Sequence, residues 1–181
     1  MVGLSTSLSS RRTARPSARQ GFSLIELVIV VVIIGIIAAI AIPRMSRGSQ
    51  GAADSALSGN LSVLRNAVDL YQTEHQVYPA SALGDTQTVL DRQLTKYTDT
   101  TGASNGTGTK DSSHTYGPYL RKIPPLPVGT KKGAATVKIA LDTDVPGVST
   151  EAWIYYPTTG EIKANLADTE VDSKNTAYNT Y

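Results

Sequence analysis

The stretch that decides the fold is Arg19–Met45, RQGFSLIELVIVVVIIGIIAAIAIPRM. Its apolar part runs from Phe22 to Ile42, and only Ser23 and Glu26 in it are clearly polar. As a helix rising about 1.5 Å per residue, this part would be about 31 Å long, close to the bilayer core of about 30 Å. The sequence therefore predicts a membrane-spanning helix that carries one acid, Glu26.

The residues before this run form a basic leader. Residues 1–20 are rich in Ser, Arg and Ala without apolar periodicity, so we expect them to be disordered. Residues 1–21 contain four arginines and no acid, whereas the rest of the chain carries more acidic than basic side chains. The pI near 8.8 thus reflects the leader and is no evidence for nucleic-acid binding. Since basic flanks stay cytoplasmic, the C-terminal body should face outward.

A cleaved secretory signal peptide is the simpler interpretation, with Ala39-Ile40-Ala41 as its cleavage site. Two features oppose it. The run Leu27–Ile42 is uninterrupted and is long for the apolar region of a signal peptide. Glu26 would also cost about 2.5–3.5 kcal/mol at mid-membrane, and less nearer an end. The pair Arg11-Arg12 suggests a twin-arginine signal, but the apolar residues expected soon after it are absent.

The segment GFSLIE, Gly21–Glu26, resembles the cleavage and methylation motif of type IV prepilins. The match combines a basic leader ending in Gly, a Phe, an acid four residues later and a long Val/Ile run, and Pro43 fits the same family. The resemblance implies that a membrane-embedded prepilin peptidase cuts between Gly21 and Phe22. It also implies that Phe22 becomes N-methylated on its new amine.

Glu26 has a physical role in such a filament. The apolar helices bundle away from water, and the carboxylate of one subunit can meet the Phe22 ammonium of a neighbour. Because an unpaired buried charge is costly, a subunit out of axial register would be penalised. We therefore interpret the pair as a device that sets register. The sequence leaves open whether the partner is a neighbour's amine or the subunit's own.

The chain should continue as a helix beyond the apolar run. Pro43 lacks a backbone N–H and predicts a kink, and the glycines of residues 47–51 weaken the helix. Because residues before proline disfavour helix, it should end before Tyr78-Pro79. We expect one helix from Phe22 to Gln76, with its second half packed on a head. Apolar residues recur there at steps of three and four: Ala53, Ala56, Leu57, Leu61, Leu64, Ala67, Val68 and Tyr71.

The head is expected to be a small sheet with loops. A short helix is expected near Thr88–Lys96, and residues 98–115 have the Gly, Ser and Thr content of a flexible surface loop. Gly160 suits a positive φ in the turn 157–160. The polar tail after residue 166 is either mobile or drapes over the sheet. Strands are expected at 135–141 (with Val137, Ile139 and Leu141 on one face), 151–157 and 161–166.

The expected fold class is α+β: a long N-terminal helix, half transmembrane and half amphipathic, packed on a small antiparallel sheet, as in the pilin fold. The expected segments are a cleaved leader at 1–21 and a transmembrane and filament-core helix at 22–46. They continue with the amphipathic half of the helix at 47–78 and the head with its polar tail at 79–181.

Two segments of the head narrow the resemblance. YGPYLRKIPPLP, residues 116–127, is similar to the GPYL…IP segment of the major pseudopilin of type II secretion systems. VYPA, residues 77–80, is similar to the YP that ends the long helix in that group. These matches are shorter and less specific than the N-terminal motif.

Calcium is the one metal that the resemblance implies, because major pseudopilins carry a calcium site near the last strands. Weak candidates are Asp142, Asp144, Asp168 and Asp172, and Glu170 lies among them. Their spacing matches no ligand pattern, and solvated acids near turns are the alternative. No other cofactor is expected.

No residue pattern is typical of an enzyme. The chain has no cysteine, which excludes disulfides and thiolate zinc sites. His75, at the end of the long helix, is interpreted as a residue favoured by the helix dipole, with a metal ligand or base as the alternative. His114 is expected to be solvated on its loop. Residues 106–110, GTGTK, lack the spacing of a phosphate-binding loop.

These features predict a non-enzymatic filament subunit, and the resemblance favours a pseudopilin of a type II secretion system. We expect a single pass to anchor it in the inner membrane, with its head in the periplasm or outside. The expected partners are further copies, the prepilin peptidase, an inner-membrane assembly platform, minor pseudopilins and, before assembly, the lipid bilayer. A type IV pilus subunit for adhesion, motility or DNA uptake is the first alternative. A membrane-anchored exported enzyme or binding protein is the second.

Overall fold

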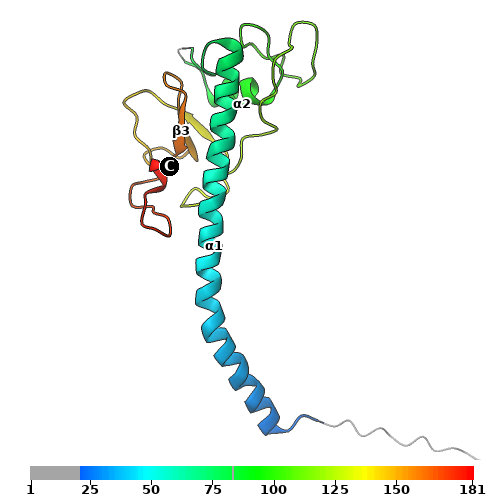
Figure 1. Ribbon diagram of the computed structural model, residues 1–181, viewed down its shortest axis with the longest axis vertical. Helices are drawn as coiled ribbons and strands as arrows, with labels where there is room; N and C mark the ends of the chain where they lie inside the picture. Colours follow the sequence, from blue (N-terminus) through cyan, green and yellow to red (C-terminus); the bar gives the residue numbers. More distant parts are fainter. Residues whose placement is uncertain (1–20, 83) are drawn as a thin grey trace, which may run out of the picture. The chain divides into compact units, whose positions relative to one another are not determined.

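The computed structural model describes residues 21–82 and 84–181, apart from the side chains of residues 42–47 (Figure 1). The chain divides into two compact units, Met1–Ile42 and Pro43–Tyr181. The leader predicted for residues 1–20 lies outside the described residues. The kink predicted at Pro43 rests on an undescribed side chain and stays a prediction.

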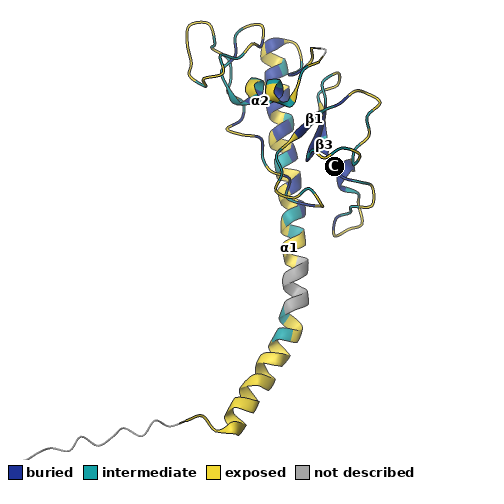
Figure 2. Ribbon diagram, turned by 180° about the vertical axis from the view of Figure 1, so that it is seen from behind, coloured by how far each residue is buried: buried dark blue, intermediate teal, exposed yellow. Residues whose placement is uncertain are grey.

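The first unit contains the apolar part of helix α1, Leu24–His75. The helix begins just after Ser23, whose carbonyl accepts a hydrogen bond from the Leu27 N–H at 3.1 Å. The side chains of this part are almost all exposed (Figure 2). The segment Leu24–Ala41 is long and apolar enough to cross a membrane. The membrane-length helix predicted from the sequence is therefore present.

In the second unit α1 continues to His75, within a residue of the predicted end. Gln76 then adopts a φ of 62° and donates its N–H to the Gln72 carbonyl at 2.8 Å, which closes the last turn. The predicted apolar face is confirmed except at Ala56, which is exposed. Its buried members are Leu57, Leu61, Leu64, Ala67, Val68 and Tyr71.

The sheet has three strands in the order β1-β2-β3, at Val137–Ile139, Trp153–Tyr156 and Glu161–Ala164. β2 and β3 pair antiparallel through the expected turn, in which Gly160 has a φ of 75°. β1, however, pairs parallel to β2, so the wholly antiparallel sheet expected from the sequence is wrong. The long connection 140–152 allows this, because it carries the chain back to the end of the sheet where β1 began.

The core lies between α1 and the sheet (Figure 2). Trp153 and Tyr155 of β2 belong to one cluster with the buried face of α1. Helix α2, Gln87–Thr95, joins it through Leu90 and Leu94, and it forms where a short helix was expected. The fold is therefore α+β, as predicted, with a mixed sheet. Leu141, expected on one face of the first strand with Val137 and Ile139, instead follows β1 and is 68% exposed.

The polar tail packs against the sheet. Its short 3-10 helix η1, Tyr178–Thr180, lies against β3, and Tyr178 is buried. The tail was expected either to be mobile or to pack over the sheet, and the structure shows the second arrangement. The loop 98–115 is likewise fixed at its base, where Thr98 pairs through its backbone with Tyr116 and Ser104.

Candidate functional site

The N-terminal candidate residues lie at the start of α1. Gly21 and Phe22 precede the helix and are exposed, with Phe22 at 80%. Glu26 lies in the first turn and is also exposed. An exposed, non-helical segment is accessible to a peptidase. A carboxylate in the first turn is favoured by the helix dipole.

The model of the prokaryotic N-terminal methylation motif matches residues 16–42. The chain carries this motif. It points to a type IV pilin-like structural subunit, and it does not distinguish a secretion system from a pilus. No curated protein matches the chain, and no solved structure does. The apolar helix followed by α2 and a small mixed sheet is consistent with the pilin fold.

The four calcium candidates are bonded to protein groups. Asp142 accepts a hydrogen bond from Thr158, and Asp144 forms a salt bridge with Lys138 at 2.9 Å. In the part of the chain that the structure describes, no group of three or more His, Cys, Asp or Glu side chains is arranged to hold a metal ion. Calcium binding stays a prediction. The other two acids also accept hydrogen bonds from the protein. Asp168 accepts one from the Asn179 side chain, and Asp172 accepts them from the backbone N–H groups of Lys174 and Thr176.

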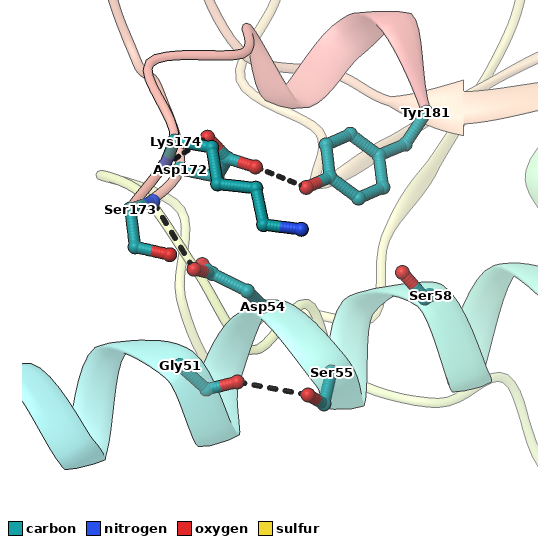
Figure 3. A pocket seen from close by; sticks show the side chains of 8 residues that line it. All are labelled: Gly51, Asp54, Ser55, Ser58, Asp172, Ser173, Lys174 and Tyr181. Atoms are coloured by element: carbon teal, nitrogen blue, oxygen red, sulfur yellow. Dashed lines mark hydrogen bonds between the residues drawn. The ribbon is translucent and has the colours of Figure 1, made fainter.

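The structure reveals one contact that sequence reasoning missed, between Asp54 of α1 and the tail. Its carboxylate accepts a hydrogen bond from the Tyr178 hydroxyl at 2.8 Å. It accepts a second from the Ser173 N–H at 3.2 Å (Figure 3). Asp54 is only 9% exposed. Burial and the neighbouring carboxylate raise the pKa of Tyr178 to about 12. The signal in the sequence was an acid beside the apolar face of the helix, between Ala53 and Leu57.

We predict that Asp54→Ala destabilises the fold by about 1–3 kcal/mol, because it leaves the buried Tyr178 hydroxyl without its acceptor. The tail should then become sensitive to protease while the sheet stays resistant. Thermal unfolding and limited proteolysis of the full chain in detergent micelles measure both effects. Asp69→Ala, at an exposed acid of the same helix, is the control. Equal losses of stability and equal protease sensitivity in the two variants would show that the Asp54 contact neither stabilises the fold nor fixes the tail.

His75 belongs to the packing of the head. It is 8% exposed, and its Nε2 lies 3.0 Å from the Thr98 hydroxyl and 3.1 Å from the Tyr119 hydroxyl. Tyr119 in turn donates its hydroxyl to Glu74, and burial together with this contact raises the pKa of Tyr119. The Tyr71 ring packs against the His75 ring in a tilted arrangement, with a centroid distance of 4.2 Å. The residue thus joins the end of α1 to the neighbouring loops, a packing role that helix-dipole reasoning alone did not foresee.

Two acids organise the loop 98–115. The Thr101 hydroxyl and the backbone N–H of Thr101 and Ala103 hold the pKa of Asp99 below its ordinary 3.8. The backbone and side chain of His114 do the same for the pKa of Asp111. His114, expected to be solvated, is therefore a half-buried donor within the loop. The loop has more internal structure than its composition suggested.

A depressed pKa in the folded state contributes stability that is present above the unfolded pKa and is lost as the pH falls through the lowered value. We therefore expect the loop to be unchanged from neutral pH down to 3.8 and to open only below it. Amide hydrogen exchange at Ala103 and His114 checks this expectation. Asp111→Asn should weaken protection of His114 at all pH values. Opening of the wild-type loop above 3.8 would contradict the assignment.

Proposed function

We propose that this chain is a filament-forming pseudopilin of a type II secretion system, whose filament helps to push folded proteins through an outer-membrane pore. The observation that carries the proposal is the methylation motif ahead of a membrane-length helix, with Glu26 in the first turn. The chain would be held in the inner membrane by one pass with its head on the outer side, because the basic residues precede the span.

Two steps lead from the inserted precursor to the filament. A membrane-embedded prepilin peptidase would cut between Gly21 and Phe22, and Phe22 would be methylated on its new amine. An inner-membrane platform, driven by a cytoplasmic ATPase complex, would then move the apolar helix from the bilayer into a bundle of like helices. In both surroundings the apolar side chains stay out of water.

A type IV pilus subunit is the rival function. Two features favour the secretion system: the similarity of residues 116–127 to major pseudopilins, and the absence of any cysteine to close a C-terminal loop, as many adhesive pilins do. The contact of Asp54 with Tyr178 and Ser173 gives the tail a non-covalent attachment instead.

Mass spectrometry of the mature chain tests the class. We expect a protein that starts at methylated Phe22, whereas a start at Met1 or after Ala41 would refute the proposal. Deleting the gene then separates the two functions. Loss of exported proteins from the medium, with surface attachment and motility retained, is the expected result. The reverse pattern would identify a pilus.

A further inference from the structure

The pair Asn105-Gly106 lies in the loop 98–115 of the head. It is the only place in the sequence where an asparagine is followed by a glycine. Gly106 and Thr107 are exposed to solvent. Apart from its chain neighbours, no described residue comes within 4 Å of the position that a Cβ of Gly106 would occupy. The peptide between Asn105 and Gly106 is therefore accessible to water and free of steric hindrance.

Three hydrogen bonds fix the Asn105 side chain. Its Oδ1 accepts from the Thr107 N–H at 3.2 Å, which folds the side chain back over the peptide that follows it. Its Nδ2 donates to the Thr109 carbonyl at 2.7 Å and to the Asp111 carboxylate at 3.1 Å. A backbone N–H that donates to a carbonyl oxygen stabilises the negative charge that develops there when a nucleophile attacks. The Thr107 N–H therefore favours attack on the Asn105 Cγ.

A nucleophile is available in the next residue. The backbone nitrogen of Gly106 reaches the Asn105 Cγ by closing a five-membered ring, and glycine hinders this least because it has no Cβ. The Gly106 N–H donates to the Ser104 hydroxyl at 3.1 Å, so its proton has an acceptor as the nitrogen attacks. The electrophile, the nucleophile and the proton acceptor thus lie in three consecutive residues.

We infer that Asn105 is a self-modifying residue, which converts into aspartate or isoaspartate with water as its only reactant. The Gly106 nitrogen bonds to Cγ and gives its proton to solvent through the Ser104 hydroxyl. The Cγ–Nδ2 bond breaks, and the leaving nitrogen takes up a proton from solvent and departs as ammonia. Water then opens the cyclic imide at either carbonyl, which gives one carboxylate in place of the amide. The step depends only on the loop and not on the proposed function.

The new carboxylate would lie against that of Asp111. The backbone and side chain of His114, followed by the Asn105 amide, hold the pKa of Asp111 below its ordinary 3.8, so Asp111 is ionised at neutral pH. Conversion removes the donors to Thr109 and Asp111 and replaces them with a like charge. Because the ammonia is lost, the change is irreversible. We therefore expect it to open the loop permanently and to make the head more acidic as the protein ages.

Ageing of the full chain in detergent micelles at mildly alkaline pH tests the conversion, since the deprotonated nitrogen is the nucleophile. Peptide mapping by mass spectrometry measures it. We expect the peptide that contains Asn105 to gain the mass difference between an amide and an acid and to contain isoaspartate. Conversion at Asn105 no faster than at the other asparagines would overturn the inference. These internal controls, each followed by a residue with a side chain, are Asn60, Asn66, Asn165, Asn175 and Asn179.

Two variants test the route. Asn105→Gln keeps an amide at this position but needs a six-membered ring, so it should convert at least about tenfold more slowly. Gly106→Ala puts a methyl group beside the attacking nitrogen and should also slow the conversion of Asn105 by about tenfold. Because this variant must adopt the φ of 72° found at Gly106, the glutamine variant accompanies it. An unchanged rate in both variants would show a route other than attack by Gly106 and would refute the inference.

Amide hydrogen exchange tests the opening of the loop. The His114 N–H donates to the Asp111 carboxylate at 2.8 Å, so its protection reports on this part of the loop. Asn105→Asp imitates the product, whereas Asn105→Ala removes the same hydrogen bonds without adding a charge. We expect exchange at His114 to be about fivefold faster in the aspartate variant than in the alanine variant, through repulsion between two exposed carboxylates. Equal exchange in the two variants would contradict the opening.

Discussion

Glu26→Ala is expected to impair filament assembly strongly while leaving processing of the N-terminus largely intact. In the proposed processing, the peptidase would recognise the exposed, non-helical segment around Gly21 and Phe22, which the substitution does not touch. In the filament, however, the Phe22 ammonium would be buried among apolar helices without its carboxylate. An uncompensated charge in such surroundings costs several kcal/mol, so filament yield should fall by about tenfold or more. Electron microscopy measures the yield and mass spectrometry the processing.

Glu26→Asp and Glu26→Gln refine this test. The aspartate keeps the charge and should retain part of the assembly, whereas the glutamine keeps the shape and should assemble poorly. Mixing Glu26→Ala with wild-type chain separates the two possible partners of the carboxylate. If it pairs with a neighbour's amine, the variant should enter mixed filaments, since wild-type neighbours can supply the missing carboxylate. Normal filament yield from Glu26→Ala alone would refute the register role.

Trp153→Ala should be the most destabilising single substitution tested in the head. Trp153 is fully buried between the sheet and α1, and its indole N–H donates to the Pro124 carbonyl at 2.9 Å. Truncation removes the largest side chain of the core and leaves that carbonyl without its donor. The expected loss is about 3–5 kcal/mol, against a total stability of about 5–15 kcal/mol for a typical domain. The head should therefore unfold at a much lower urea concentration.

Circular dichroism is the suitable probe, because Trp153 is the only tryptophan and its fluorescence disappears with it. Val148→Ala is the matched control. It removes apolar atoms from a side chain that is 77% exposed and should change the free energy of unfolding by less than about 0.5 kcal/mol. A loss of less than about 1 kcal/mol for Trp153→Ala would mean that the core of the head lies elsewhere.

The features that depend on neighbouring residues in the chain could be predicted. The apolar run, the end of α1 before Tyr78-Pro79, the short helix α2 and the positive φ of Gly160 all follow from local rules. The methylation motif lies within one short segment, residues 16–42, so it too could be identified without a structure. Each of these features is caused by residues that are close together in the chain, so a short stretch of sequence is enough to predict it.

The tertiary structure decided what joins distant residues. The alternation of apolar residues in a strand indicates which side chains share a face, but not whether the neighbouring strand runs parallel or antiparallel. The parallel pairing of β1 with β2 was therefore missed. Asp54 and Tyr178 are 124 residues apart, and neither signals the other in the sequence. A groove beside the turn after α1 likewise brings Ala80 together with Leu141 and Pro157, which follow β1 and β2. Such contacts arise because the buried faces of α1 and the sheet must meet, and that packing alone brings the remote polar groups together.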